Sequence, residues 1–162
     1  MKRIYSVLVE NRSGVLMKVA GLFCRRGFNI DSLAVGETDD PKVSCMTIVS
    51  SGDERTIEQI EKQLNKKLDV IKVKTFDEKI SVTRELMLVK VKYNKNNRRD
   101  IMEICDILKA NIVDMSKHFM VIQICDRPDK IEILLNMLKE VSIVEVARTG
   151  VLALQKCSET DK

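Results

Sequence analysis

Apolar residues follow two alternating spacings along the start of the chain, one typical of strands and one typical of helices. Residues 3–10 are rich in Val, Leu, Ile and Tyr and stop at the turn-forming stretch Asn-Arg-Ser-Gly at 11–14, which predicts a strand. Apolar residues then recur at helical spacing over 15–26, and Gly27 suits the position just past a helix end. The chain is therefore predicted to open with a strand and a helix.

Four further elements complete a first unit. Residues 28–36 and 43–51 have strand-like composition and are separated by a polar turn, which predicts an antiparallel hairpin. Asp53 is placed to cap a second helix that runs to about Lys66, and a strand over 68–75 follows. The resulting order, βαββαβ, is the ferredoxin-like arrangement of two helices packed on one face of an antiparallel sheet.

The same order then repeats after a polar stretch at 76–83. The repeat consists of a strand over 85–93, a helix over 98–110, strands over 111–116 and 118–125, a helix over 130–139 and a strand over 143–148, which residues 150–155 extend. The predicted fold class is α+β, with two tandem ferredoxin-like (βαββαβ) domains. The predicted organisation is a first domain at 1–76, a linker at 77–83, a second domain at 84–157 and a polar tail at 158–162.

Composition narrows the possible functions. The hydrophobic content of 44% in 162 residues is sufficient for packed cores, so disorder is not expected. Although 32% of residues are charged, the net charge is only +4, which argues against a nucleic-acid-binding arm. Each half of the chain is small enough for its core to be marginal, so we expect it to pair with a neighbour.

The cysteines and the N-terminus indicate the cellular compartment of the protein. The five cysteines include no close Cys-x-x-Cys pair, so we expect reduced thiols of a cytosolic protein and no metal site. The N-terminus lacks the pattern of a signal peptide, and no segment is long enough to span a membrane. A cytoplasmic protein is expected, or an organellar one if a transit segment has been removed.

The turn at 11–14 and the start of the following helix are the candidate site. A helix N-terminus offers unpaired N–H groups and partial positive charge, and Gly14 lets a ligand approach the backbone, so a small carboxylate fits. Asn11 and Asn29 are expected at neighbouring strand ends, where their amides can hold the polar groups of an amino acid. Alternatively, Asn11 or Ser13 merely caps the helix and Gly14 eases the turn.

The sequence gives little support for a catalytic function. The sole histidine, His118, falls in a predicted hairpin with no nucleophile or metal partner near it in sequence, and no Arg-bearing phosphate loop of the acylphosphatase type is present. An RNA-binding sheet uses exposed aromatic residues, and here aromatic residues are only 4% of the chain. We therefore expect a protein that is not an enzyme.

The stretch from 11 to 33, Asn-Arg-Ser-Gly-Val-Leu-Met-Lys-Val-Ala-Gly-Leu-Phe-Cys-Arg-Arg-Gly-Phe-Asn-Ile-Asp-Ser-Leu, closely resembles the ACT-domain signature of acetolactate synthase (acetohydroxyacid synthase) small subunits. General ACT domains share only a looser pattern of Asn/Asp-x-x-Gly-x-Leu and Gly-x-Asn-Ile. Further resemblance occurs at 38–41, 59–64, 84–90 and 143–150, whereas the Lys- and Asn-rich stretch 94–99 matches no motif of the family.

This resemblance implies a regulatory subunit that activates a thiamine-diphosphate enzyme of branched-chain amino acid biosynthesis and confers feedback inhibition by valine. In the family, ACT domains pair edge to edge as homodimers and valine binds at the pair's interface. Carried over, Asn11, Gly14 and Asn29 contact the polar ends of valine, and the pocket is lined by Ser13, Val15, Leu16 and Ile30.

The resemblance also assigns cofactors and partners. No cofactor is expected in this chain, whereas thiamine diphosphate, Mg and FAD are expected in the large catalytic subunit. The second domain lacks an Asn-x-x-Gly turn, so we do not expect it to bind valine in the same way. The alternative function is a stand-alone ACT-domain amino-acid sensor that regulates another protein.

Overall fold

The computed structural model describes residues 1–76 and 80–157, which form two compact units. The first contains Met1–Val82 together with Val151–Lys162, and the second contains Thr83–Gly150. Residues 77–79 of the predicted linker and the predicted tail at 158–162 lie outside the described residues. The chain thus enters the second unit after Val82 and returns to the first after Gly150.

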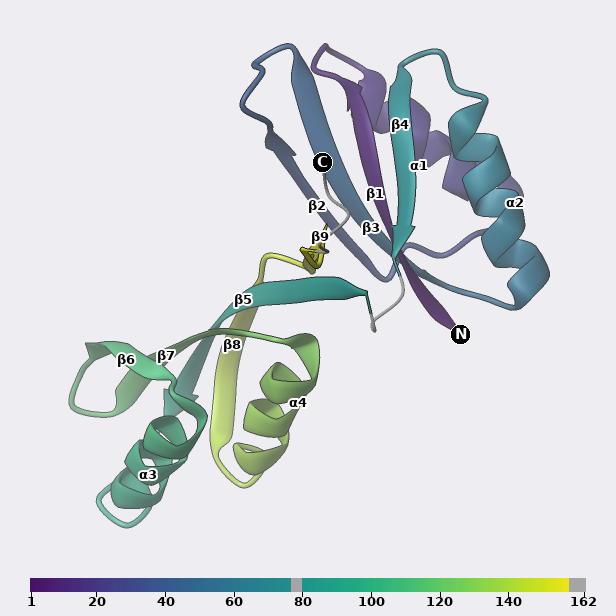
Figure 1. Cartoon of the computed structure of the whole chain (residues 1–162). Helices are drawn as coiled ribbons and strands as arrows, with labels where there is room; N and C mark the ends of the chain where they lie inside the picture. Colours follow the sequence, from purple (N-terminus) through teal and green to yellow (C-terminus); the bar gives the residue numbers. More distant parts are fainter. Residues whose placement is uncertain (77–79, 158–162) are drawn as a thin grey trace. The chain divides into compact units, whose positions relative to one another are not determined.

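The first unit contains a four-stranded antiparallel sheet in the order β2-β3-β1-β4, with both helices on one face (Figure 1). Its elements are β1 (Lys2–Glu10), α1 (Val15–Arg26), β2 (Ser32–Glu37), β3 (Val43–Ser51), α2 (Glu54–Asn65) and β4 (Val70–Phe76). The order βαββαβ and the ferredoxin-like topology agree with the prediction.

Local signals account for the helix ends of this unit. α1 ends at Gly27, which adopts φ 66° and is free of the Cβ that disfavours this conformation in other residues. α2 begins after Asp53, whose carboxylate accepts a hydrogen bond from the Thr56 N–H at 2.8 Å. β2 starts four residues later than predicted, because Phe28 and Ile30 pack against the core before the chain joins the sheet edge.

Two apolar layers enclose the first sheet. Between the sheet and its helices lie Tyr5, Val7, Val9, Val15, Val19, Leu22, Phe23, Met46, Ile48, Ile57, Ile60 and Leu64. On the opposite face, Ile4, Val49 and Phe76 pack with Val151 and Ala153, which flank the start of the short strand β9 (Leu152–Gln155). Burial of these side chains against apolar neighbours holds residues 151–153 in the first unit.

The predicted extension of the last strand over 150–155 is wrong. β8 ends at Arg148, and Gly150 adopts φ 82°, a conformation that turns the chain out of the strand. The N–H of Val151 then donates to Ser32 Oγ at 3.0 Å, and the separate strand β9 pairs with β5. Residues 151–157 therefore pack in the first unit, whereas the predicted second domain includes them.

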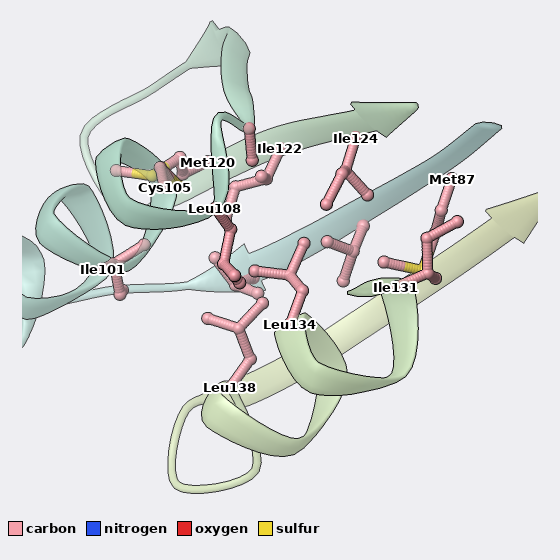
Figure 2. Close-up of a cluster of buried hydrophobic side chains, with 13 residues drawn as sticks. Met87, Ile101, Cys105, Leu108, Met120, Ile122, Ile124, Ile131, Leu134 and Leu138 are labelled. Atoms are coloured by element: carbon pink, nitrogen blue, oxygen red, sulfur yellow. The ribbon is translucent and has the colours of Figure 1, made fainter. Parts of the chain in front are cut away.

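The second unit repeats the topology with the strand order β6-β7-β5-β8. Its elements are β5 (Ser81–Lys92), α3 (Arg98–Leu108), β6 (Asn111–Met115), β7 (Phe119–Asp126), α4 (Pro128–Met137) and β8 (Ser142–Arg148). Figure 2 shows how side chains from both helices meet those of the sheet, among them Ile101, Leu108, Leu134, Met120 and Ile122. This unit has its own core.

Candidate functional site

The turn between β1 and α1, residues 11–14, is tied to the hairpin that joins β2 and β3. The Asn11 N–H donates to the Lys42 carbonyl oxygen at 2.7 Å. Its side-chain Nδ2 donates to Glu37 Oε1 at 2.9 Å and to the Pro41 carbonyl oxygen at 2.8 Å. Both Nδ2 hydrogens are therefore used, whereas Asn11 Oδ1 accepts no hydrogen bond within residues 1–76 or 80–157. That oxygen is available to a ligand's donor.

Gly14 is the N-cap residue of α1, which begins at Val15. It adopts φ 84°, it is exposed, and a Cβ added to it meets nothing within 4 Å. No side chain caps α1, so the alternative that Asn11 or Ser13 serves as the cap does not hold, whereas Gly14 does ease the turn. The first turn of α1 contains no acidic residue. The positive end of this helix is thus open to an anion.

The apolar residues predicted for the site divide into two groups. Val15 is only 2% exposed and Ile30 is partly buried, and both pack in the core between sheet and helices. Leu16 is 44% exposed. Ser13 is exposed within the turn. Of these four residues, Ser13 and Leu16 present side chains at the surface, Val15 is buried beneath the turn, and Ile30 packs against the core elsewhere, beside Asn29.

Asn29 lies at the opposite end of the sheet from Asn11, so the prediction that the two are neighbours is wrong within one chain. Asn11 is bonded to Lys42, and the Asn29 carbonyl oxygen accepts from Ser50 Oγ at 2.6 Å. Lys42 and Ser50 are eight positions apart along an extended chain, or roughly 25 Å. The reason is that β1 and β2 both run antiparallel to β3 and hence parallel to each other.

Asp69, which sequence reasoning did not single out, joins the turn from the other side. Its carboxylate is 8% exposed and receives Lys18 Nζ at 2.8 Å and the Arg12 guanidinium. Lys18 and then Arg12 hold the pKa of Asp69 below its usual value. No local motif marks Asp69, because its partners lie more than 50 positions away in sequence.

The described residues contain no group of three or more His, Cys, Asp or Glu side chains arranged to hold a metal ion. His118 is exposed between β6 and β7. No helix in the described part of the chain has the length and apolar character needed to cross a bilayer.

Two family profiles match the two halves of the chain. One, described as an AHAS small subunit-like ACT domain, matches residues 5–72. The other, described as the small subunit of acetolactate synthase, matches residues 84–157. Together they cover most of both βαββαβ series.

Individual proteins agree with these profiles over nearly the full length. The chain is 45% identical to the acetolactate synthase isozyme 3 small subunit of Salmonella typhimurium, over 96% of each chain. It is 44% identical to a probable acetolactate synthase small subunit of Methanothermobacter thermautotrophicus, over 97% of this chain and 94% of that one. The crystal structure of the Thermotoga maritima small subunit superposes with a TM-score of 0.90 at 39% identity, over 98% of this chain and 99% of that one.

Proposed function

The chain belongs to the family of acetolactate synthase small subunits, and on that premise we propose that it activates the large catalytic subunit and makes it sensitive to valine. Family membership makes it a non-catalytic regulatory subunit whose partner is the large subunit. The catalytic cofactors accordingly belong to that partner, and we propose that they are thiamine diphosphate, Mg and FAD.

The proposed effector pocket forms only when two copies of the chain pair. β2 is an edge strand of the first sheet, so its outer side is open to a second strand. An antiparallel pairing centred on Val35 brings Asn29 of the partner subunit beside Pro41, whose carbonyl oxygen accepts a hydrogen bond from Asn11. Pairing thus joins two residues that lie at opposite ends of one sheet, and a C2 dimer contains two such pockets.

Each polar group of valine finds a suitable partner in this pocket. The carboxylate fits the N-terminus of α1 at Gly14, where no side chain caps the helix and the first turn contains no acidic residue. The ammonium group fits Asn11 Oδ1 and the partner subunit's Asn29. Leu16, which is 44% exposed in the first turn of α1, offers apolar surface to the isopropyl group. Val15 shapes the floor without touching the ligand, and Ile30 contributes only from the partner subunit, next to Asn29.

Inhibition requires that valine bind one arrangement of the regulatory dimer more tightly than another. A ligand held by groups from both copies meets this requirement, because its contacts depend on how the copies sit against each other. Coupling free energies between sites are typically about 1–3 kcal/mol. A modest change in the edge pairing is therefore sufficient to regulate the partner.

The second unit differs from the first at the equivalent turn. Asn94 Oδ1 accepts from the N–H groups of Asn96 and Asn97 at 2.9 and 3.1 Å, and Asn97 Oδ1 accepts from the Asn94 N–H at 2.8 Å. Asp100 stands in the first turn of α3. The turn satisfies its own N–H groups and its helix end carries a carboxylate, so we propose that it does not bind valine.

The observation that carries the proposal is the uncapped start of α1 beside Asn11 in a chain of this family. The test measures acetolactate formation by the large subunit alone, with this protein, and with this protein plus valine. We expect activation by the protein and inhibition by valine only in its presence. A valine-binding dimer that neither co-purifies with nor activates the large subunit would instead support the stand-alone sensor.

A further inference from the structure

We propose that Asp69 is a positioning residue that holds the β1–α1 turn in the conformation that binds the effector. This inference rests on the proposed effector pocket and adds to it a residue that does not touch the ligand. Asp69 lies in the loop between α2 and β4, on the side of the turn opposite the β2–β3 hairpin. The turn is thus held between two loops.

The contacts of Asp69 all lead to this turn. Its carboxylate accepts hydrogen bonds from Arg12, which lies within the β1–α1 turn, and from Lys18 Nζ at 2.8 Å. Lys18 lies in the first turn of α1. The Asp69 carbonyl oxygen accepts from the Glu10 N–H at 3.0 Å, at the end of β1. Arg12 also pairs with Glu10, at 2.7 Å. One residue therefore connects the strand before the turn, the turn and the helix after it.

The turn needs such support because its own sequence supplies little. Gly14 has a wide choice of backbone conformations, and no side chain caps α1. A ligand that must first order this segment loses affinity to the entropy of ordering. The Asp69 carboxylate is nearly buried, so any movement that withdraws Arg12 and Lys18 leaves an unpaired charge. The native turn is therefore the favoured one before ligand arrives.

Asp69 is not itself a ligand of the effector. Its negative charge would repel a carboxylate, and both of its oxygens are already bonded to cations. A competing possibility is that Arg12 or Lys18 binds the effector's carboxylate and Asp69 withholds it. The two possibilities differ in sign: positioning predicts weaker effector binding when the Asp69 charge is removed, and withholding predicts tighter binding.

The test compares Asp69→Asn with Glu85→Gln in the full-length dimer, using valine as the probe in calorimetry. Glu85 is a matched control, because its carboxylate is 3% exposed and is bonded twice to Arg148, at 2.8 and 2.9 Å, in the second unit. Thermal unfolding reports the stability lost in each variant. We expect Asp69→Asn to weaken valine binding at least tenfold and Glu85→Gln to leave it within twofold.

A double-mutant cycle separates positioning from general destabilisation. In an Arg12→Gln/Lys18→Gln background, Asp69→Asn has no partners left to lose, so we expect no further loss of valine affinity. If Asp69→Asn does not fold, Arg12→Gln carries the test, because that side chain is 60% exposed. Unchanged or tighter valine binding in Asp69→Asn, or full additivity in the cycle, overturns the inference. Failure of the wild-type protein to bind valine overturns the proposed pocket instead.

Discussion

Asn11 Nδ2 lies 2.9 Å from Glu37 Oε1, so the first residue of the β1–α1 turn is bonded directly to the last residue of the edge strand β2. A change at the edge strand is therefore transmitted to the turn by this bond, beside the two that join Asn11 to Pro41 and Lys42 in the adjoining hairpin. The bond provides a physical route between the proposed pairing of two copies and the conformation of the proposed pocket.

Gly14→Asp is expected to abolish inhibition by valine, raising the half-inhibitory concentration at least tenfold, while activation of the large subunit persists. The added carboxylate occupies the proposed place of the ligand's own, and it meets no steric clash because nothing lies within 4 Å of the new Cβ, although the φ of +84° strains any residue with a side chain. Asp and Asn adopt the left-handed backbone more readily than other residues. Gly14→Asn is the control for size: if it abolishes inhibition equally, charge is not the cause. Inhibition curves on the reconstituted enzyme make the comparison.

Val35→Glu is expected to shift the protein from dimer to monomer and to weaken valine binding with it. Val35 is 46% exposed on β2, and in the proposed pairing two such carboxylates face each other. Val113→Glu is the matched control, since Val113 is 50% exposed on β6, the equivalent edge of the second sheet. Sedimentation velocity measures the oligomeric state of both variants. A monomer produced only by Val113→Glu would place the dimer contact on the second unit.

Ala153→Asp is expected to lower the free energy of unfolding of the first unit by about 2–4 kcal/mol, because it buries a carboxylate without a partner. Ala153 is 5% exposed, between Ile4, Val49 and Phe76. Leu154 is the next residue and is 73% exposed. Leu154→Asp should change the free energy of unfolding by no more than about 0.5 kcal/mol. Urea titrations test the pair. Equal effects would mean that β9 does not cover this sheet in solution.

The stability of the first unit is expected to depend on Asp69 at acid pH. Lys18 and Arg12 lower the pKa of Asp69 in the folded state. As pH falls, the Asp69 carboxylate is therefore protonated in the unfolded chain before it is protonated in the folded protein. The stabilisation is therefore complete above the unfolded value of about 4 and is lost as pH drops through the lower folded pKa. Asp69→Asn should reduce the slope of the free energy of unfolding against pH below about pH 4. Identical slopes in the two proteins would contradict this.

Cys105 is expected to resist alkylation until the protein unfolds. Burial raises its pKa to about 11, so at pH 8 roughly 0.1% is thiolate, the reactive form. The exposed Cys24, Cys125 and Cys157 serve as internal controls in the same sample. Mass spectrometry after brief iodoacetamide treatment should find them labelled and Cys105 unlabelled. Rapid labelling of Cys105 would show that the core of the second unit opens readily.

Most elements were predictable because their signals are local. The helical spacing over Val15–Arg26 matches α1 at both ends, and Asp53 caps α2 as predicted. The exposed Gly14 turn was also found from neighbouring residues, since a strand end, a glycine and a helical pattern follow one another within a few positions. Boundaries moved where packing intervened, as at residues 28–31, which the core draws away from the strand.

The sequence by itself determined the repeated βαββαβ order, the helix ends of the first unit and the identity of the turn, because periodicity and capping act over a few residues. The tertiary structure alone decided that Asn29 lies far from Asn11, that Asp69 meets Arg12 and Lys18, and that residues 151–155 return to the first unit. Each of these depends on which strands become neighbours and in which direction they run. Such long-range pairing has no local signature, because it is selected by the burial of whole faces at once.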